Sequence, residues 1–392
     1  MPDHRLSSEA ATLLADLRRY AAEPLDATRT TPPAAYNSQE IYDLEMRQIF
    51  GKGWVCPGFA ADIPNTGDYI TYSIVDQPVF VIRDRDGAIR TFSNVCLHRM
   101  MILLEGSGST RKIMCPYHAW TYDLDGALIG AGHMQKTTGF DRKEYCLPEI
   151  RTEIWNGWIY ITLNPDAPSI SEELAPLDPL LARYGMASYV PVIHQDQVWQ
   201  TNWKLLTENF MEGYHGPVAH KATVGAGIKL EETRFPEERR TAFTYSTFTK
   251  PEGAPYGTAH PDNRRLEGLW RRTALMPTIF PSHMFSCSPD YLWHLSLRPK
   301  GPGEVQVRVG VALAPENYAA INDLDAHLAP LIQFFDQVNA EDRIVVEGIY
   351  KGSLAPLASS GPLSWLEREI HDFMGYLAKA LEPELEQGSP KS

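Results

Sequence analysis

Two pairs of cysteine and histidine lie close together in the first half of the chain. One residue separates Cys96 from His98, two separate Cys115 from His118, and sixteen lie between the pairs. Four sulfur and nitrogen ligands fill the first shell of one metal centre. Zinc is one candidate, although this Cys-His, Cys-His order is unusual for a structural zinc site. The other is a two-iron cluster in which two cysteines hold one iron and two histidines hold the other.

A second set of candidate ligands lies near the middle of the chain. We expect a helix from Thr201 or Asn202 to the break at Gly216-Pro217. Separations of four and three residues then place three side chains on one face of that helix, namely Glu208, Glu212 and His215. His220 follows in the next turn of chain, close enough to bind the same ion as His215. Two imidazoles suit iron, zinc or copper, and a third ligand is needed.

A carboxylate far along the chain is the candidate third ligand. Helical spacing predicts an apolar stripe formed by Leu331, Phe335, Val338, Val345, Val346 and Ile349. Asp342 falls in the middle of this stripe, where a carboxylate costs several kcal/mol unless a cation meets it. Glu341 sits at the edge of the stripe, and Asp336 and Glu347 lie off it. Two histidines and one carboxylate with open positions are typical of the Fe(II) site of non-haem oxygenases.

The segments around these residues predict two domains. From Trp54 to about Asn164, short runs rich in valine, isoleucine, tyrosine and threonine alternate with turns. Asp86-Gly87 and Asp125-Gly126 lie between such runs and indicate hairpins. We therefore expect an all-β domain at residues 51–165. Helical and strand patterns mix in residues 166–392, which predicts an α+β domain.

The first fifty residues are expected to accompany the second domain. Residues 1–37 are polar and end in a proline-rich stretch, which indicates a loosely held arm. A short helix fits Ser38 to Phe50, with Ser38 as its N-cap. We expect this arm and helix, residues 1–50, to pack on the α+β domain.

Composition narrows the class of protein. The 392 residues carry a formal net charge of −13, and no cluster of lysine and arginine indicates binding to nucleic acid or anionic lipid. No apolar run reaches the ~18 residues that span a bilayer, and the first residues lack a secretory pattern, so we expect a cytoplasmic protein. Five cysteines are too few for a disulfide scaffold in a chain of this length.

The segments that contain the Cys-His pairs resemble the Rieske family. They read Cys96-Leu-His98-Arg99 and Cys115-Pro-Tyr-His118-Ala-Trp-Thr-Tyr-Asp-Leu-Asp-Gly126. This resemblance implies a [2Fe-2S] Rieske cluster in which Cys96 and Cys115 bind the inner iron. His98 and His118 then bind the outer iron, nearer to solvent. A zinc knuckle, or a chance set of core cysteines, is the alternative.

The stretch opened by Asn-Trp-Lys, with the spacing Glu208-x3-Glu212-x2-His215-x4-His220, resembles the catalytic domain of Rieske oxygenase α subunits. The likeness covers most of residues 40–350. It implies that the ligands of a mononuclear Fe(II) are His215, His220 and Asp342. Glu212 occupies the position at which the family connects a neighbouring subunit's Rieske histidine to the iron site. Aspartate is the commoner residue at this position in the family, and the glutamate found here is similar to what the carnitine and betaine branch carries. Asn209 is a second catalytic candidate.

The resemblance also implies an architecture and partners. The fold class is α+β: an all-β Rieske [2Fe-2S] domain plus a helix-grip-like catalytic domain with a mononuclear iron site. No Gly-x-Gly-x-x-Gly dinucleotide motif follows a strand. Electrons from NAD(P)H are therefore expected from a separate reductase that carries flavin and an iron–sulfur centre. The family also implies a homotrimer.

The expected activity is that of a Rieske-type non-haem iron monooxygenase or dioxygenase. The leading substrate class is small quaternary ammonium compounds of the carnitine, choline or betaine type, which are hydroxylated or N-demethylated. Residues 361–376 resemble the glycine betaine demethylase branch. The alternatives are an aromatic ring hydroxylase or aryl O-demethylase, and a protein that only transfers electrons. Aromatic side chains that could hold a trimethylammonium group, or form sheet core instead, are Phe210, Tyr214, Tyr256, Trp270, Tyr291 and Trp293.

Overall fold

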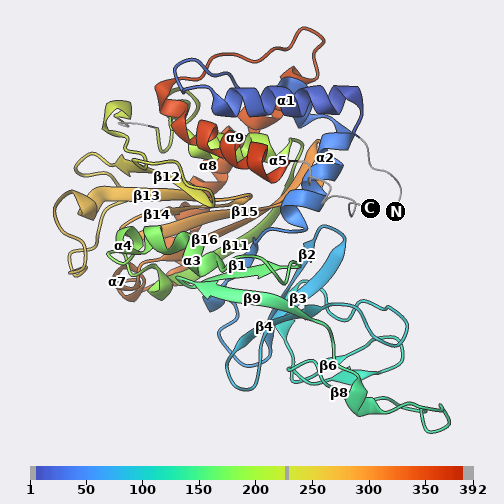
Figure 1. Ribbon diagram of the computed structural model, residues 1–392. Helices are drawn as coiled ribbons and strands as arrows, with labels where there is room; N and C mark the ends of the chain where they lie inside the picture. The colour runs from blue at the N-terminus through green and yellow to red at the C-terminus, as the bar shows by residue number, and fades with distance from the viewer. Residues whose placement is uncertain (1–5, 226–228, 383–392) are drawn as a thin grey trace.

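Short β-branched and aromatic runs separated by turns form the β-rich region of the computed structural model (Figure 1). Its larger sheet is antiparallel, in the order β1-β10-β9-β4-β3-β2-β5, and a smaller sheet has the order β6-β7-β8. The strands are β1 (Val55–Phe59), β2 (Asp68–Ile74), β3 (Gln77–Arg83), β4 (Ile89–Ser93), β5 (Ser107–Ser109), β6 (Ile113–Met114), β7 (Thr121–Tyr122), β8 (Leu128–Gly130), β9 (Glu149–Trp155) and β10 (Trp158–Thr162). Asp86-Gly87 connects β3 to β4 and Asp125-Gly126 connects β7 to β8, so both predicted hairpins are confirmed.

The structure describes residues 6–225 and 229–382. The outer ends of the first and last predicted regions, residues 1–5 and 383–392, lie outside the described residues. Within the described ranges, no helix is both long and apolar enough to cross a membrane.

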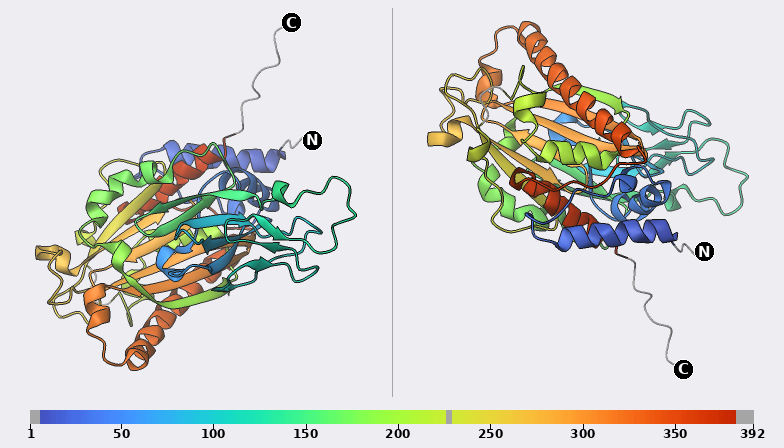
Figure 2. Two further views of the ribbon diagram at one scale, coloured as in Figure 1. Left: turned by 90° about the horizontal axis from the view of Figure 1, so that it is seen from below. Right: turned by 90° about the horizontal axis from the view of Figure 1, so that it is seen from above.

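The second region is built on a six-stranded antiparallel sheet in the order β11-β16-β15-β14-β13-β12. Its strands are β11 (Val190–Trp199), β12 (Phe243–Thr249), β13 (Thr273–Ile279), β14 (His283–Cys287), β15 (Tyr291–Gly301) and β16 (Glu304–Leu313). Three helices cover one face of this sheet, namely α5 (Trp203–Met211), α8 (Leu324–Ser353) and α9 (Arg368–Ala380). Figure 2 shows the long α8 running obliquely across the strands. Helices over an antiparallel sheet agree with the predicted α+β fold.

The N-terminal arm is not loose, which corrects the prediction. Helix α1 (Ser8–Ala22) packs along α9 (Figure 1). Its apolar side chains recur at spacings of four, three and four residues and are buried as Ala10, Leu14, Leu17 and Ala21. The prediction failed because the polar residues between them dominate the composition. The next helix starts as expected, since the Ser38 hydroxyl accepts the Ile41 N–H at 3.3 Å.

Shorter helical segments connect these elements. The α-helical ones are α2 (Gln39–Glu45), α3 (Ile170–Leu174), α4 (Asp178–Leu181), α6 (Gly216–Ala219) and α7 (Pro315–Ala319), and a π-helical turn, η2, spans Met46–Phe50. The 3-10 turns are η1 (Pro33–Tyr36), η3 (Ala60–Asp62), η4 (Arg142–Glu144), η5 (Ala175–Leu177), η6 (Met186–Ser188), η7 (Leu230–Glu232), η8 (Gly268–Arg272) and η9 (Trp365–Glu367).

The β-rich region and the helix-covered sheet share buried side chains. One hydrophobic cluster joins Ile70 and Val81 of the first region to Leu295 and Val307 of the second. A separate cluster lies in the part of the β-rich region that contains the Cys-His pairs, with Phe80, Phe92, Ile113, Tyr122 and Leu128 around Cys96 and Cys115. The two cysteines are therefore anchored in a core of their own.

Candidate metal centres and active site

The two Cys-His pairs lie at the tips of two loops with the same backbone pattern. The Cys96 N–H donates to the Met101 carbonyl at 2.8 Å, and the Met100 N–H donates back to the Cys96 carbonyl at 3.0 Å. In the second loop, the N–H of Cys115 donates to the Trp120 carbonyl at 2.8 Å and that of Ala119 to the Cys115 carbonyl at 3.1 Å. Both Met100 and Ala119 have positive φ angles, of 58° and 56°. The loops thus present their ligands in equivalent ways.

The side chains of the two loops converge. The rings of His98 and His118 meet edge to face with centroids 4.7 Å apart, and His98 stacks on Trp120 at 4.9 Å. Both cysteines are buried, while His118 is exposed. The Nδ1 atom of His98 is buried and has no hydrogen-bond partner among the described residues. A buried ring nitrogen of this kind normally has a partner, and a metal ion bound between the loops would supply one.

The helix that leads to the second site ends earlier than predicted. Asn202 caps α5 by accepting the Lys204 N–H at 3.0 Å, but the helix stops at Met211, and Glu212 is extended. Gly213 follows the break, and a Cβ there would stand 2.6 Å from the Phe248 ring, so the chain passes close to β12 at this point. The expectation that Glu208, Glu212 and His215 share one helical face is therefore wrong. Any Cβ at this position would require Phe248 to move, and Phe248 belongs to a distant strand.

Glu208 lies apart from the metal ligands. Its carboxylate accepts the Tyr36 hydroxyl at 2.7 Å and the Thr31 hydroxyl at 3.3 Å. It lines a second cavity, of about 400 Å³, together with Glu367. Asn209, the second catalytic candidate, is buried and lines both this cavity and the one beside the histidines.

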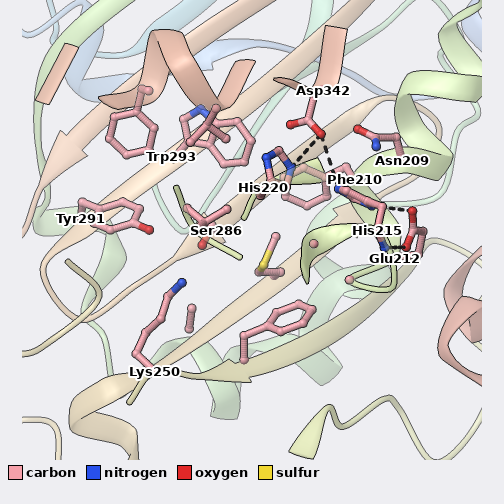
Figure 3. A pocket seen from close by; sticks show the side chains of 18 residues that line it. Asn209, Phe210, Glu212, His215, His220, Lys250, Ser286, Tyr291, Trp293 and Asp342 are labelled. Carbon is pink, nitrogen blue, oxygen red and sulfur yellow. Dashed lines mark hydrogen bonds and ion pairs between the residues drawn. The ribbon is translucent and has the colours of Figure 1, made fainter. Parts of the chain in front are cut away.

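Three of the predicted ligands meet in one place. His215 and His220 flank the short helix α6, and Asp342 comes from the middle of α8. The Nε2 atoms of His215 and His220 lie 3.5 Å and 3.0 Å from Asp342 Oδ1. The three side chains offer ligand atoms within 4.8 Å of one another (Figure 3). We refer to His215, His220 and Asp342 as the triad.

Each histidine of the triad is oriented by a second carboxylate. Glu212 Oε1 lies 2.5 Å from His215 Nδ1, and Glu212 Oε2 accepts the His215 backbone N–H at 2.9 Å. Glu341 Oε2 lies 2.8 Å from His220 Nδ1 and accepts the Thr223 hydroxyl at 2.5 Å. Carboxylates on the far ring nitrogen fix the orientation and the tautomer of metal-binding histidines. The sequence placed Glu341 only at the edge of the stripe, and nothing in its spacing indicated this contact.

The charges of the triad suit a cation. Burial alone would lower the pKa of His215, but hydrogen bonds to Asp342 and Glu212 outweigh it and raise that pKa to about 10. Burial likewise opposes the Asp342 carboxylate, yet both histidines hold its pKa below the usual value. Positive charge is therefore strongly favoured at this point. Two imidazoles and one carboxylate are also donors that iron accepts, so the residues fit a mononuclear iron.

A cavity of about 100 Å³ opens on the triad between the sheet and helices α5 and α8. Its aromatic walls come from Phe210 of α5, Tyr291 and Trp293 of β15, and Phe335 of α8. Trp293 lies 5.6 Å from Phe210 and 6.1 Å from Phe335 between ring centroids. Strand pairing sets Ser286 opposite Trp293, and both line the cavity. Figure 3 shows Phe210, Tyr291, Trp293 and Ser286 around the space beside the triad.

Three of the six predicted aromatic contacts are absent from the cavity wall. Tyr214 is 54% exposed, Tyr256 packs on Phe334 with centroids 4.7 Å apart, and Trp270 packs against Tyr184 and Arg183. Tyr256 and Trp270 are each held elsewhere by a neighbour distant in sequence, whereas Tyr214 faces solvent.

The cavity also has walls that were not predicted. They include Phe248, Lys250, Met276, Ser286 and Phe335. Phe335 could have been found, since it lies seven residues before Asp342 on the same helical stripe. For the strand residues, no signal distinguished a cavity wall from sheet core. Two residues of the predicted stripe, Val345 and Ile349, line the second cavity instead.

Comparison with known proteins gives two family matches. Residues 53–145 match the Rieske [2Fe-2S] domain, and residues 184–382 match the catalytic domain of the ring hydroxylating alpha subunit. The first match favours the [2Fe-2S] cluster over zinc for the Cys-His loops. Together the matches confirm the predicted fold class.

Relatives of known activity cover the same regions. The chain is 36% identical to the glycine betaine monooxygenase oxygenase subunit of Pseudomonas aeruginosa over 371 residues, 86% of each protein. It is 36% identical to the subunit of that name from Chromohalobacter salexigens over 206 residues, but this alignment spans only 46% of that protein.

Solved structures share the fold. A crystal structure of the quaternary ammonium Rieske monooxygenase CntA with L-carnitine matches with a TM-score of 0.78 and 23% identity, covering 93% of this chain and 99% of CntA. The naphthalene 1,2-dioxygenase of Rhodococcus sp. matches with a TM-score of 0.77 and 22% identity, covering 96% and 99%. At these identities the likeness concerns the fold alone.

Proposed function

This chain belongs to the Rieske-type ring hydroxylating α-subunit family of non-haem iron oxygenases, and from that premise we propose that it hydroxylates or N-demethylates a small quaternary ammonium compound. Carnitine, choline and betaine define the class. This substrate class is supported by the two relatives described above, which are both named as glycine betaine monooxygenase subunits.

The observation that carries the proposal is the aromatic cavity beside the triad. Faces of Trp293, Phe335, Phe210 and Tyr291 surround the space next to Asp342. A methylated ammonium donates no hydrogen bonds, and aromatic faces attract it with ~0.5–2 kcal/mol per contact once water is excluded. The same faces bring an N-methyl group close to the triad.

We assign the metal groups to the two sites as follows. Cys96, His98, Cys115 and His118 hold the [2Fe-2S] cluster, and the triad holds Fe(II). When bound, the cluster stores single electrons and the Fe(II) supplies the chemistry of O2. Glu212 and Glu341 keep the imidazoles of His215 and His220 oriented. Asn209 and Glu212 line the space around the triad.

The reaction balances with one O2 and two electrons. One oxygen atom enters a C–H bond of an N-methyl group, and the other leaves as water with two protons. The resulting N-hydroxymethyl compound loses formaldehyde and one proton, which leaves a dimethylamine. Oxygen insertion at another carbon would instead give a stable alcohol.

Electron supply and assembly are part of the proposal. We infer that a separate flavin and iron–sulfur reductase delivers electrons from NAD(P)H, and that the chain works as a cytoplasmic homotrimer. The exposed His118 supports the first inference, because the cluster edge is accessible to another protein. We also propose residues 51–165 and 166–392 as the Rieske and catalytic domains, with residues 1–50 attached to the latter.

An aromatic ring hydroxylase or aryl O-demethylase is the second candidate. The naphthalene 1,2-dioxygenase has the same fold, so the fold is compatible with both candidates. The aromatic walls of the cavity would also accept a flat ring. A role in electron transfer alone is less well supported, since the triad offers the ligands of a second metal centre.

The test compares glycine betaine with a compound of equal shape but no positive charge, in which a tert-butyl group replaces the trimethylammonium group. A flat aromatic acid represents the second candidate. Purified protein, with a generic reductase and NADH, is given glycine betaine, its tert-butyl isostere and a flat aromatic acid. We expect formaldehyde and substrate-dependent NADH consumption with the betaine alone. Equal turnover of betaine and isostere, or a preference for the aromatic acid, would contradict the proposal and favour the second candidate.

A further inference from the structure

One wall of the cavity carries a positive charge. Lys250 follows β12, lines the cavity, and in Figure 3 its nitrogen points into it. Its backbone is fixed, because its N–H donates to the Arg272 carbonyl at 2.8 Å and its carbonyl accepts from the Arg272 guanidinium. The stem lies against Gly257, where a Cβ would stand 2.9 Å from Lys250 Cγ. The side chain is thus directed inwards by its surroundings.

The ammonium group of Lys250 has no carboxylate partner within the described part of the chain. No described carboxylate oxygen lies within 4.0 Å of its Nζ. Asp290 acts on it electrostatically, but the oxygens of Asp290 already accept the Gly257 N–H at 3.0 and 2.9 Å. Burial lowers the pKa of Lys250, and Asp290 opposes this effect. A bound anion would complete the missing pair.

The groups near Lys250 suit an anion. Ser286 and Tyr291 also line the cavity and carry hydroxyl groups. The Ser286 hydroxyl has one weak contact, with Ser288 Oγ at 3.4 Å, so it is available to donate to a ligand. The cavity therefore combines the triad, aromatic faces, and a lysine with two hydroxyl groups.

We propose that Lys250 binds the carboxylate of the substrate, so that the enzyme selects zwitterionic ammonium carboxylates over ammonium alcohols such as choline. This inference rests on the proposed function and narrows its substrate class. The lysine acts as a point charge on the carboxylate, while the aromatic faces hold the ammonium. An ammonium alcohol offers only positive charge, and Lys250 repels it.

The test measures binding without turnover. Glycine betaine and choline are titrated by calorimetry into the oxidised holoenzyme and its variants. Lys250→Met should weaken glycine betaine binding by about 10- to 100-fold, the loss expected for a hydrogen bond to a charged group. Choline binding should stay the same or improve. Lys250→Arg should keep betaine binding within a few-fold, and Lys351→Met, at an exposed lysine of α8, should change neither ligand.

Several outcomes would overturn the assignment. Equal loss of both ligands in Lys250→Met would indicate a packing role, and unchanged betaine binding would remove the contact. A wild-type protein that prefers choline would refute the role of Lys250 but leave the ammonium oxygenase intact, whereas one that binds no ammonium compound would refute both. If Lys250→Met misfolds and loses the visible Rieske spectrum, the test uses the wild-type protein instead. It compares glycine betaine with its methyl ester, which lacks the carboxylate charge, and equal binding of the two would refute the proposal.

Discussion

The two candidate metal regions are held in opposite ways. In the Rieske loops, backbone hydrogen bonds within six residues set the positions of Cys96 and Cys115, and His118 stays exposed. In the triad, His220 and Asp342 are buried and come from segments 122 residues apart, and side-chain carboxylates hold the imidazoles. A centre that exchanges electrons with another protein benefits from an accessible edge. A centre that binds a substrate benefits from a closed cavity.

This difference implies that the carboxylates near the triad act in a graded way. Asp342 faces both histidines, Glu212 and Glu341 each contact one, and Glu208, on the helix before them, contacts neither. Removing each in turn should affect the triad less and less, while the Rieske loops, which depend on their own backbone, stay unchanged.

The largest effect is expected from Asp342→Ala. Loss of the shared carboxylate should release the mononuclear iron and reduce turnover by about 10³-fold or more, because a metal ion contributes several kcal/mol to such chemistry. Iron analysis should fall from about three to about two per chain, with an unchanged Rieske spectrum.

The matched control is Cys96→Ala. It should abolish the visible absorbance and leave about one iron per chain. An Asp342→Ala protein that keeps all its iron, or that also loses the cluster, would contradict the separation of the two regions.

Glu212→Gln should come next. A neutral amide weakens the 2.5 Å contact with His215 Nδ1. We therefore expect both metals to remain and turnover to fall by close to ~100-fold, the upper limit for loss of such a carboxylate. Single-turnover reduction of O2 by pre-reduced protein measures whether transfer of the cluster electron is the slowed step. Glu238→Gln, at an exposed glutamate, is the control. A full single-turnover rate would remove the role of Glu212.

Glu341→Gln should have a smaller effect on the same site. The amide can still accept one hydrogen bond from His220 Nδ1 or the Thr223 hydroxyl, but it lacks the charge that favours the metal-bound imidazole. We expect iron affinity to fall by about 10-fold, measured by competition with a chelator. Thr223→Val should change it less. Affinity equal to that of the wild type would show that His220 needs no carboxylate.

The same contrast explains what the sequence could predict. Cys96, His98, Cys115 and His118 were recognisable because each pair lies within four residues and local backbone bonds complete the loop. Asp342 was recognisable because a charge interrupts an apolar helical stripe.

Other features depend on contacts between distant segments. The close passage of Gly213 beside Phe248, just after the helix end at Met211, depends on a distant strand, and the role of Glu341 depends on how α8 is rotated toward His220. Local spacing carries no information on such contacts. For the same reason, only three of the six aromatic residues predicted for the cavity line it.

Glu208→Gln should have the smallest effect on the triad of the four carboxylate substitutions. We expect it to change the free energy of unfolding and to leave both metal centres unchanged. Burial raises the pKa of Glu208 to about 7, opposed by the hydrogen bond from Tyr36. Between pH 4.5 and about 7 the folded protein therefore binds more protons than the unfolded chain, so the free energy of unfolding falls as pH rises through this window and levels above it. The full effect is about 3 kcal/mol.

Thermal unfolding from pH 4.5 to 8 measures this effect. The midpoint of the wild type should drop by a few degrees relative to Glu208→Gln as pH rises, while the iron content of both stays equal. Tyr36→Phe removes the hydrogen bond that lowers the pKa of Glu208, so it should extend the window to higher pH. Parallel pH profiles of the wild type and Glu208→Gln would mean that the buried carboxyl is ionised throughout. A loss of triad iron in Glu208→Gln would instead extend the graded series to a residue that touches neither histidine.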